Sequence, residues 1–255
     1  MGTKKENEVH SQGYMMKQGE TFVKKWFNDT ISLFETEIKS DDSVNHLCVT
    51  SLTVSVKYCE AILILLSRDC RMPAKALLRV LFELASKLAW CLRVPDEEMD
   101  AAGEIVEKKI RQWAKSSVVK NLKLLNGLKE CITDDKASKL DNRIEKFETI
   151  KNSLDCDKMP TFLNVLKELP GTWGTELYTR CYLQFNNAVH LDVSSLGDRV
   201  KKDGEKLFVV YDSEDNIQDL VQYCVIFEKM VLYLVRTHYG WDTKKMQNDF
   251  EGLVW

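Results

Sequence analysis

Apolar positions are densest between residues 72 and 92, where their spacing predicts a helix that is hydrophobic on nearly every side. Pro73 suits the first turn of such a helix, because its missing N–H would have no partner there. One stripe of charged residues interrupts this apolar surface at every fourth position: Arg71, Lys75, Arg79, Glu83 and Lys87. A charge among apolar side chains must be paired or hydrogen-bonded. The charged stripe therefore lines a polar pocket or holds structural ion pairs, and the pattern leaves both interpretations open.

Helical periodicity recurs along most of the chain. Residues 47–66 are ambiguous, because their first half alternates β-branched residues as a strand would, whereas their second half is typical of a helix. We interpret the whole segment as a helix, since no turn residue divides it. Residues 1–13 are polar and predict a flexible leader. The other predicted helices span residues 14–38, 96–130, 133–154, 161–169, 173–191 and 213–239.

One short segment, residues 206–211, has the composition of a strand, and no partner strand can be identified for it. The predicted fold is therefore all-α: a single multi-helix, bundle-like domain with at most a minor β element near 206–211. We expect an N-terminal leader and helix over residues 1–40, a helical core domain over 41–240 and an apolar C-terminal tail over 241–255. The tail should dock on the body of the protein or on a partner chain.

Composition narrows the class of protein. Only 4 prolines and 11 glycines in 255 residues favour long helices, and a net charge of −3 gives no global signal for nucleic acid. The first twenty residues lack the apolar region of a signal peptide, and charges interrupt the most apolar windows, so we expect no membrane span. The 8 cysteines contain no C-x-x-C pair. Reduced, mostly buried thiols in a cytoplasmic protein are the better interpretation.

Several motifs that carry chemistry are missing from the sequence. It has no phosphate-binding G-x-x-x-x-G-K-[ST] loop, no G-x-G-x-x-G turn, no G-x-S-x-G elbow and no H-E-x-x-H helix. Only 4 histidines occur, and they are scattered along the chain. We therefore expect neither a metal site nor a bound cofactor.

A second polar cluster lies in the predicted helix over 173–191. Tyr182, Asn186 and His190 are four residues apart, and Asn187 precedes His190 by three, so these side chains fall on adjoining helix faces. Histidine is the usual general acid–base near neutral pH. The alternative is a structural histidine that donates a hydrogen bond to a carbonyl at the end of the helix.

Two sequence features carry a resemblance to known families. The helix Ala76-Leu-Leu-Arg79-Val-Leu-Phe-Glu83, followed by Tyr178, Tyr182, Asn187 and His190, resembles a group of uncharacterised bacterial helical domain families with an Arg-x-x-x-Glu helix and a later Tyr…His helix. The likeness spans residues 45–240. These families in turn resemble HEPN domains, which are helical RNA-binding and RNA-cleaving modules of toxin–antitoxin and phage-defence systems. HEPN sites place an arginine four to six residues before the histidine, whereas Arg180 precedes His190 by ten.

The resemblance implies a HEPN-like protein of a bacterial antiviral-defence or toxin–antitoxin system, acting as a metal-independent endoribonuclease. His190, Asn187 and Arg180 would then be catalytic. The ligand would be bound by Arg79, Glu83, Tyr182 and Asn186. RNA, a second copy of the chain in a homodimer and a protein from the same operon are the implied partners. The alternative is a non-catalytic helical module that binds a ligand or a partner protein through the polar pocket, so the sequence leaves open whether the chain is an enzyme.

Overall fold

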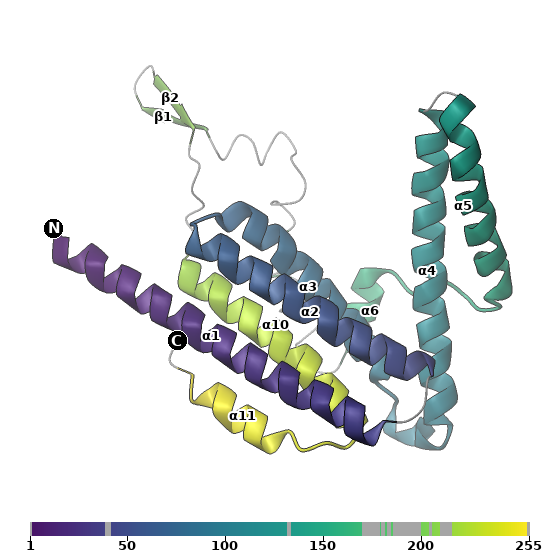
Figure 1. Cartoon of the computed structure of the whole chain (residues 1–255), viewed down its shortest axis with the longest axis horizontal. Helices are drawn as coiled ribbons and strands as arrows, with labels where there is room; N and C mark the ends of the chain where they lie inside the picture. The colour runs from purple at the N-terminus through teal and green to yellow at the C-terminus, as the bar shows by residue number, and fades with distance from the viewer. Residues whose placement is uncertain are drawn as a thin grey trace. The chain divides into compact units, whose positions relative to one another are not determined.

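The computed structural model describes residues 2–38, 42–131, 134–169, 179, 182, 185, 200–203, 206–209 and 216–253. The described part is almost entirely helical, which confirms the predicted all-α class (Figure 1). The chain forms two compact units by its contacts. One contains residues 1–92 and 165–255, and the other contains residues 93–164. The sequence pattern had not indicated this division of the predicted core domain.

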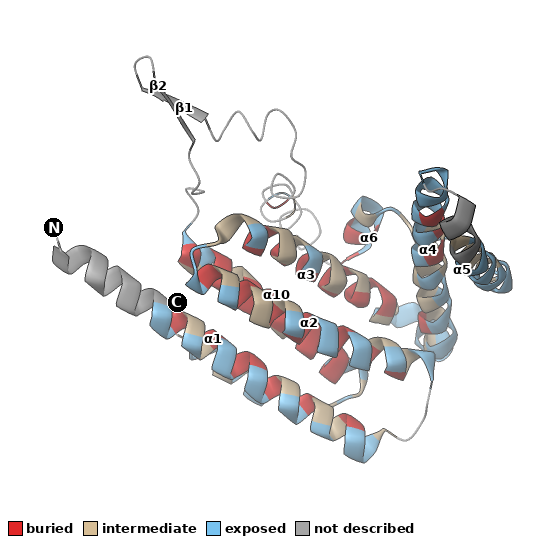
Figure 2. Ribbon diagram, turned by 45° about the horizontal axis from the view of Figure 1, so that its top comes forward, coloured by how far each residue is buried: buried red, intermediate tan, exposed pale blue. Residues whose placement is uncertain are grey.

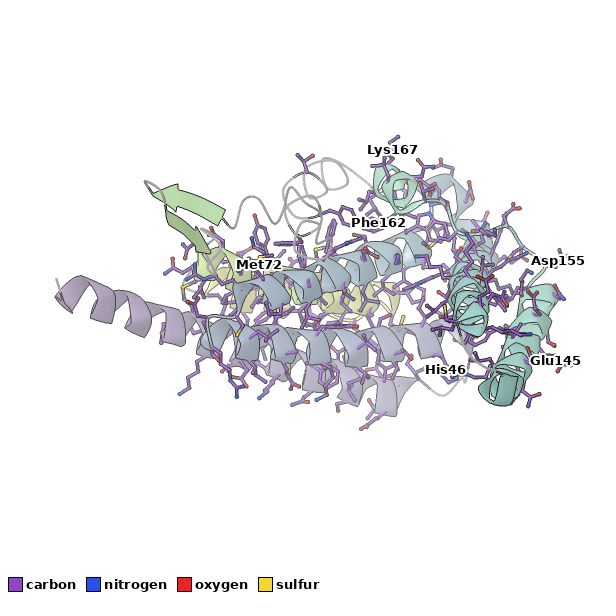
Figure 3. All side chains as sticks on the ribbon, turned by 90° about the horizontal axis from the view of Figure 1, so that it is seen from above. His46, Met72, Glu145, Asp155, Phe162 and Lys167 are labelled. Atoms are coloured by element: carbon purple, nitrogen blue, oxygen red, sulfur yellow. The ribbon has the colours of Figure 1, made fainter. Side chains whose placement is uncertain are left out.

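Four long helices lie side by side in the first unit: α1 (Gly2–Glu37), α2 (Ser43–Ser67), α3 (Arg71–Leu92) and α10 (Ile217–His238) (Figure 1). Helices α2 and α3 are antiparallel, with His46 and Met72 marking opposite ends of the pair in Figure 3. A tight turn joins them, in which Asp69 has a positive φ of 56° and the Cys70 N–H donates to the Leu65 carbonyl at 2.8 Å.

The core of this unit lies among α2, α3 and α10, whose buried faces are seen in Figure 2. Leu52 and Ile62 of α2, Leu78 and Leu81 of α3, and Val231 of α10 have no solvent exposure. Burial of this much apolar surface is what stabilises a bundle of long helices, since helix propensity alone is weak.

The ambiguous segment 47–66 lies within helix α2, as interpreted from the sequence. Asp42 caps the helix by accepting a hydrogen bond from the Asn45 N–H at 2.8 Å. The β-branched residues of its first half are accommodated because packing against three neighbouring helices outweighs their strand propensity. Among the described helices, α2 alone is long and apolar enough to cross a membrane. In this structure its buried residues pack in the bundle core.

Both ends of the described chain are helical, and the tail docks on the body of the protein, one of its two expected positions. Helix α1 begins at Gly2, so the prediction of a flexible leader over residues 1–13 is wrong; lysine, glutamate and glutamine in this stretch favour helix. The tail contains a short helix, α11 (Lys244–Glu251), which docks on α1 of the same chain. The rings of Phe250 and Phe22 are 5.7 Å apart, and the Trp241 indole N–H donates to Glu37 at 2.6 Å.

The second unit is a helical hairpin of α4 (Ala102–Glu130) and α5 (Asp134–Ser153), preceded by the 3₁₀ helix η1 (Asp96–Ala101). The predicted single helix over 96–130 thus begins with a 3₁₀ segment, a common form at helix starts. Lys115 fixes the end of the hairpin by donating to the carbonyls of Leu154 at 3.0 Å and Cys156 at 2.5 Å. The core of α4 is small: Val106, Val118, Leu122 and Leu125.

A short helix and a two-stranded hairpin complete the described chain. Helix α6 (Phe162–Glu168) agrees with the predicted helix over 161–169, and Glu168 accepts a hydrogen bond from the Trp90 indole at 2.5 Å. The predicted strand near 206–211 is β2 (Lys206–Val209), which pairs antiparallel with β1 (Val200–Asp203). Val200 lies opposite Val209 in this hairpin. The missing partner of the predicted strand is therefore the segment directly before it.

Candidate functional site

The charged stripe of α3 lies at the margin of the buried core. Lys75 is buried, while the side chains of Arg79, Glu83 and Lys87 are 14%, 24% and 15% exposed. A spacing of four residues advances slightly more than one helical turn, so these groups follow one another along one side of α3. The aliphatic part of each long side chain covers apolar surface while the charged end meets its neighbours.

Glu83 is the centre of a short ionic ladder. Arg79 Nε donates to Glu83 Oε1 at 3.3 Å, and Lys87 Nζ donates to Glu83 Oε2 at 3.1 Å. Both carboxylate oxygens are therefore occupied by cations from the same helix. Such i,i+4 pairs contribute about 0.2–0.5 kcal/mol each when exposed, and their value rises as water is excluded. The ladder holds the guanidinium of Arg79 in one orientation.

Arg79 also joins α3 to the segment that follows residue 178. Its Nη2 donates to the phenolic oxygen of Tyr182 at 2.8 Å, and its guanidinium carbon lies 4.7 Å from the centre of the Tyr182 ring. A hydrogen bond and a cation–π contact thus act on the same pair. Arg79, Glu83 and Tyr182, three residues predicted to share a ligand site, lie together in the structure.

The Tyr182 segment is anchored one turn further on. Phe185 is only 1% exposed, and its ring lies 5.8 Å from the ring of Tyr223 on α10. Tyr223 in turn stacks on Phe227 at 6.1 Å, and Phe227 lies 5.2 Å from Phe82 of α3. This row of aromatic rings positions Tyr182 beside Arg79. The row follows from helical spacing, because Tyr182 and Phe185, like Tyr223 and Phe227, share a helix face.

The remaining predicted site residues cannot be compared with the structure. His190, Asn187, Asn186 and Arg180 lie outside the described residues. The predicted helix over 173–191 is described at residues 179, 182 and 185, and each of them is helical.

The sequence prediction missed two partners in this part of the bundle. Lys87 was noted in the stripe but was not assigned to the site, although its position four residues after Glu83 was a sufficient signal. Glu228 is one of the charges that interrupt the most apolar windows of the sequence, and it was not assigned to a site. It is fully buried on α10, and it accepts a hydrogen bond from Ser55 Oγ at 3.1 Å. Burial raises the pKa of the Glu228 carboxyl to about 8, and the Ser55 hydrogen bond opposes that shift.

The geometry around Arg79 suits an anion. Within the described residues, its Nε and Nη2 are occupied and its Nη1 makes no hydrogen bond. Two cations, Arg79 and Lys87, flank the carboxylate of Glu83, so the stripe carries more positive than negative charge at this point. A planar guanidinium with a donor still available binds phosphate or carboxylate oxygens well.

The chain belongs to a family of unknown function (DUF5677), which matches residues 45–207. The prediction of an uncharacterised domain family is thereby confirmed. The matched segment contains all but the first two residues of α2, α3 with Arg79 and Glu83, the hairpin unit and Tyr182, so both halves of the candidate site lie within it. No curated protein and no solved structure matches the chain.

Proposed function

We propose that this member of the DUF5677 family is a HEPN-like helical protein of a bacterial defence or toxin–antitoxin system, and that it binds and cleaves RNA without a metal ion. The observation that carries the proposal is the 2.8 Å hydrogen bond from Arg79 to Tyr182. It brings the Arg-x-x-x-Glu helix against the segment that leads to Asn187 and His190.

Binding would rest on Arg79. Glu83 and Tyr182 hold its guanidinium from two sides, which reduces the conformational entropy lost when a ligand is bound. Its Nη1 makes no hydrogen bond to a described residue and can donate to a phosphate oxygen. Contacts of this kind position the RNA backbone without reading its sequence. The expected ligand is therefore single-stranded RNA of broad sequence.

Cleavage would rest on the residues that follow Tyr182 in the chain. In the proposed reaction His190 removes the proton from a ribose 2′-hydroxyl, and the 2′-oxygen attacks the adjacent phosphorus while the bond to the 5′-oxygen breaks. The products are a 2′,3′-cyclic phosphate and a 5′-hydroxyl, whose oxygen takes a proton from water while the imidazolium returns its proton to solvent. Asn187 would orient the imidazole. Arg180 or Arg79 would stabilise the negative charge that develops on the phosphoryl oxygens. The attacking group belongs to the RNA, so no metal ion is needed to activate water.

One observation favours a second function, a non-catalytic module that binds a ligand or partner protein. Two of the donor groups of Arg79 are already occupied, and they connect two segments of the same chain. An arginine used in this way can be purely structural. The two proposals differ in whether Arg79 and His190 act on RNA.

The test is cleavage of a labelled single-stranded RNA in the presence of a chelator. The proposal predicts cleavage by the wild type, its loss in His190→Ala and weaker RNA binding by Arg79→Gln. Arg111→Gln is the matched control, because Arg111 pairs with Glu107 on the surface of α4 and its side chain is 57% exposed. RNA binding without cleavage would contradict the proposed ribonuclease activity and support a non-catalytic RNA-binding module. A wild type that neither binds nor cuts RNA contradicts the proposal and favours the second function.

We also propose that the protein acts in the cytoplasm as a homodimer, with a partner protein from the same operon. The tail over 241–255 was expected to dock on the body of the protein or on a partner chain, and Trp241 and Phe250 pack on α1 of their own chain. Val254 and Trp255 lie outside the described residues. Sedimentation of the wild type beside a variant lacking residues 241–255 tests this: a dimer that survives truncation places its interface elsewhere, and a wild-type monomer contradicts the proposal.

A further inference from the structure

Two polar rungs connect α2 and α10 inside the bundle core. Ser55 donates to Glu228 in one rung, and the next rung pairs Cys59 with Cys224. The residues of each helix are four apart and run in opposite order, as expected for antiparallel neighbours. Cys59, Cys224 and Glu228 all have 0% exposure.

The two thiols of the second rung are in direct contact. The Sγ atoms of Cys59 and Cys224 are 3.1 Å apart, and both cysteines are free. A disulfide bond has an S–S distance of about 2.05 Å, so the two sulfur atoms must approach by only about 1 Å to form one. Small side-chain rotations on adjacent helices can supply a movement of this size. The two residues are 165 positions apart in the chain, so their bond would close a very long loop.

We propose that Cys59 and Cys224 are a redox modification site that forms a reversible disulfide between α2 and α10. A two-electron oxidant of the peroxide or diazene class accepts the electrons. Two S–H bonds break, one S–S bond forms, and the two hydrogens pass to the oxidant, giving two water molecules from hydrogen peroxide or a hydrazine from a diazene. A thiol or phosphine reductant reverses the reaction.

Burial keeps this site in the dithiol state until the bundle opens. The hydrogen bond with Cys224 and burial both raise the pKa of the Cys59 thiol, so little of the reactive thiolate is present. An oxidant reaches the pair only when the α2–α10 contact separates locally. Oxidation therefore reports opening of the core, and the resulting disulfide resists further opening.

The test uses the full chain with four further cysteines replaced by serine: Cys70, Cys131, Cys156 and Cys181. This variant is oxidised with diamide, a diazene, both in buffer and in urea below its unfolding midpoint, so that access does not limit the reaction. The expected product has lost two hydrogens and yields a non-reduced peptide pair joining Cys59 to Cys224. Closing so long a loop should raise the melting temperature by roughly 5 °C or more.

Cys48 and Cys91 are the matched internal controls, because they are as deeply buried as the proposed pair. They should remain alkylatable after oxidation. Reduction with a phosphine should restore the thiols of Cys59 and Cys224, so that all four cysteines can then be alkylated. Cys59→Ser and Cys224→Ser should each prevent the crosslink. If either variant fails to fold, the peptide map of the protein that keeps both cysteines still tests the proposal. A bond between any other cysteines, or Cys59 and Cys224 that both stay alkylatable in urea, overturns the proposal. None of these outcomes depends on RNA binding.

Discussion

Two arginines of the same helical bundle have different surroundings. Arg236 on α10 is 5% exposed; its Nη1 donates to Asp29 at 2.7 Å and to Thr30 at 3.2 Å, and its Nε donates to the Asp242 carbonyl at 2.9 Å. Its guanidinium also lies 5.1 Å from the centre of the Trp26 ring.

Arg79 is 14% exposed, with Glu83 of its own helix and Tyr182 as its partners.

The comparison separates an arginine that holds the fold from one that can serve a ligand. The partners of Arg236 come from α1 and from the residues that lead into α11, so it connects three parts of the chain. Arg79 is held in place but keeps nearly three times the exposure and a donor with no described partner. Orientation combined with access is what a binding group requires, and Arg236 has only the first.

The largest expected effect is the loss of Arg236. Arg236→Met removes three hydrogen bonds of a buried guanidinium, one of them fully buried, and the contact with Trp26, so we expect the free energy of unfolding to fall by about 2–4 kcal/mol. Urea denaturation measures it. Asp29→Asn is the control and should cost much less, because the Asp29 side chain is 53% exposed. A loss for Arg236→Met no larger than that of the control would contradict the structural role.

Glu228 extends the comparison to a buried acid whose partner among the described residues is the neutral Ser55 hydroxyl. Its pKa is raised to about 8, so between the ordinary value of 4.5 and 8 the folded state holds a proton that the unfolded state releases. Stability should therefore fall as the pH rises from 4.5 to 8, by at most about 1.4 kcal/mol per pH unit from this group. Denaturation of Glu228→Gln across that range should show a flatter profile than the wild type. Identical profiles would exclude a protonated Glu228.

The Arg79–Glu83 pair should give an intermediate effect. Arg79→Met is expected to cost about 1–2 kcal/mol, because Lys87 still pairs with the carboxylate that is left behind. Arg79→Met with Glu83→Met should be tolerated better than the sum of the single changes, with a coupling of about 0.5–1.5 kcal/mol. A double-mutant cycle by urea denaturation measures this coupling. Strict additivity would mean that the pair contributes nothing to folding.

Tyr182→Phe should have the smallest effect on stability and sharpens the comparison most. The ring and its contact with Arg79 remain, so we expect a loss of about 0.5–1.5 kcal/mol from the single hydrogen bond. Binding should change more than folding, because Arg79 would lose one of the two groups that orient it. Parallel melting and RNA-binding measurements test this. A change confined to stability would make the contact structural only.

Local patterns in the sequence predicted most of the helices. The dense apolar spacing of residues 72–92 predicted α3, and the four-residue spacing of Arg79 and Glu83 predicted their contact. The partnership of Arg236 with Asp29 could not be predicted, because those residues are 207 positions apart and no local pattern links them. The same holds for Cys59 with Cys224. Contacts within a helix follow from periodicity, whereas contacts between helices depend on the packing of the whole bundle.

The candidate site was predictable to the same extent. Tyr182 was chosen for its spacing from His190, and the structure places it against Arg79, which was chosen for a separate reason. Glu228 was passed over because a glutamate in an apolar stretch is usually assigned to an exposed position, whereas here it is fully buried. Sequence periodicity identifies a helix face, but only tertiary packing decides which charges on that face are enclosed.

The most direct test of the account is an RNA titration of the wild type and Arg79→Gln at several salt concentrations, followed by fluorescence anisotropy. If Arg79 contacts a phosphate, the variant should bind more weakly and the slope of log affinity against log salt should decrease by about one. Arg111→Gln should retain the wild-type slope. A wild type that binds no RNA, or an Arg79→Gln variant with unchanged affinity and slope, would contradict the claim that Arg79 serves a ligand.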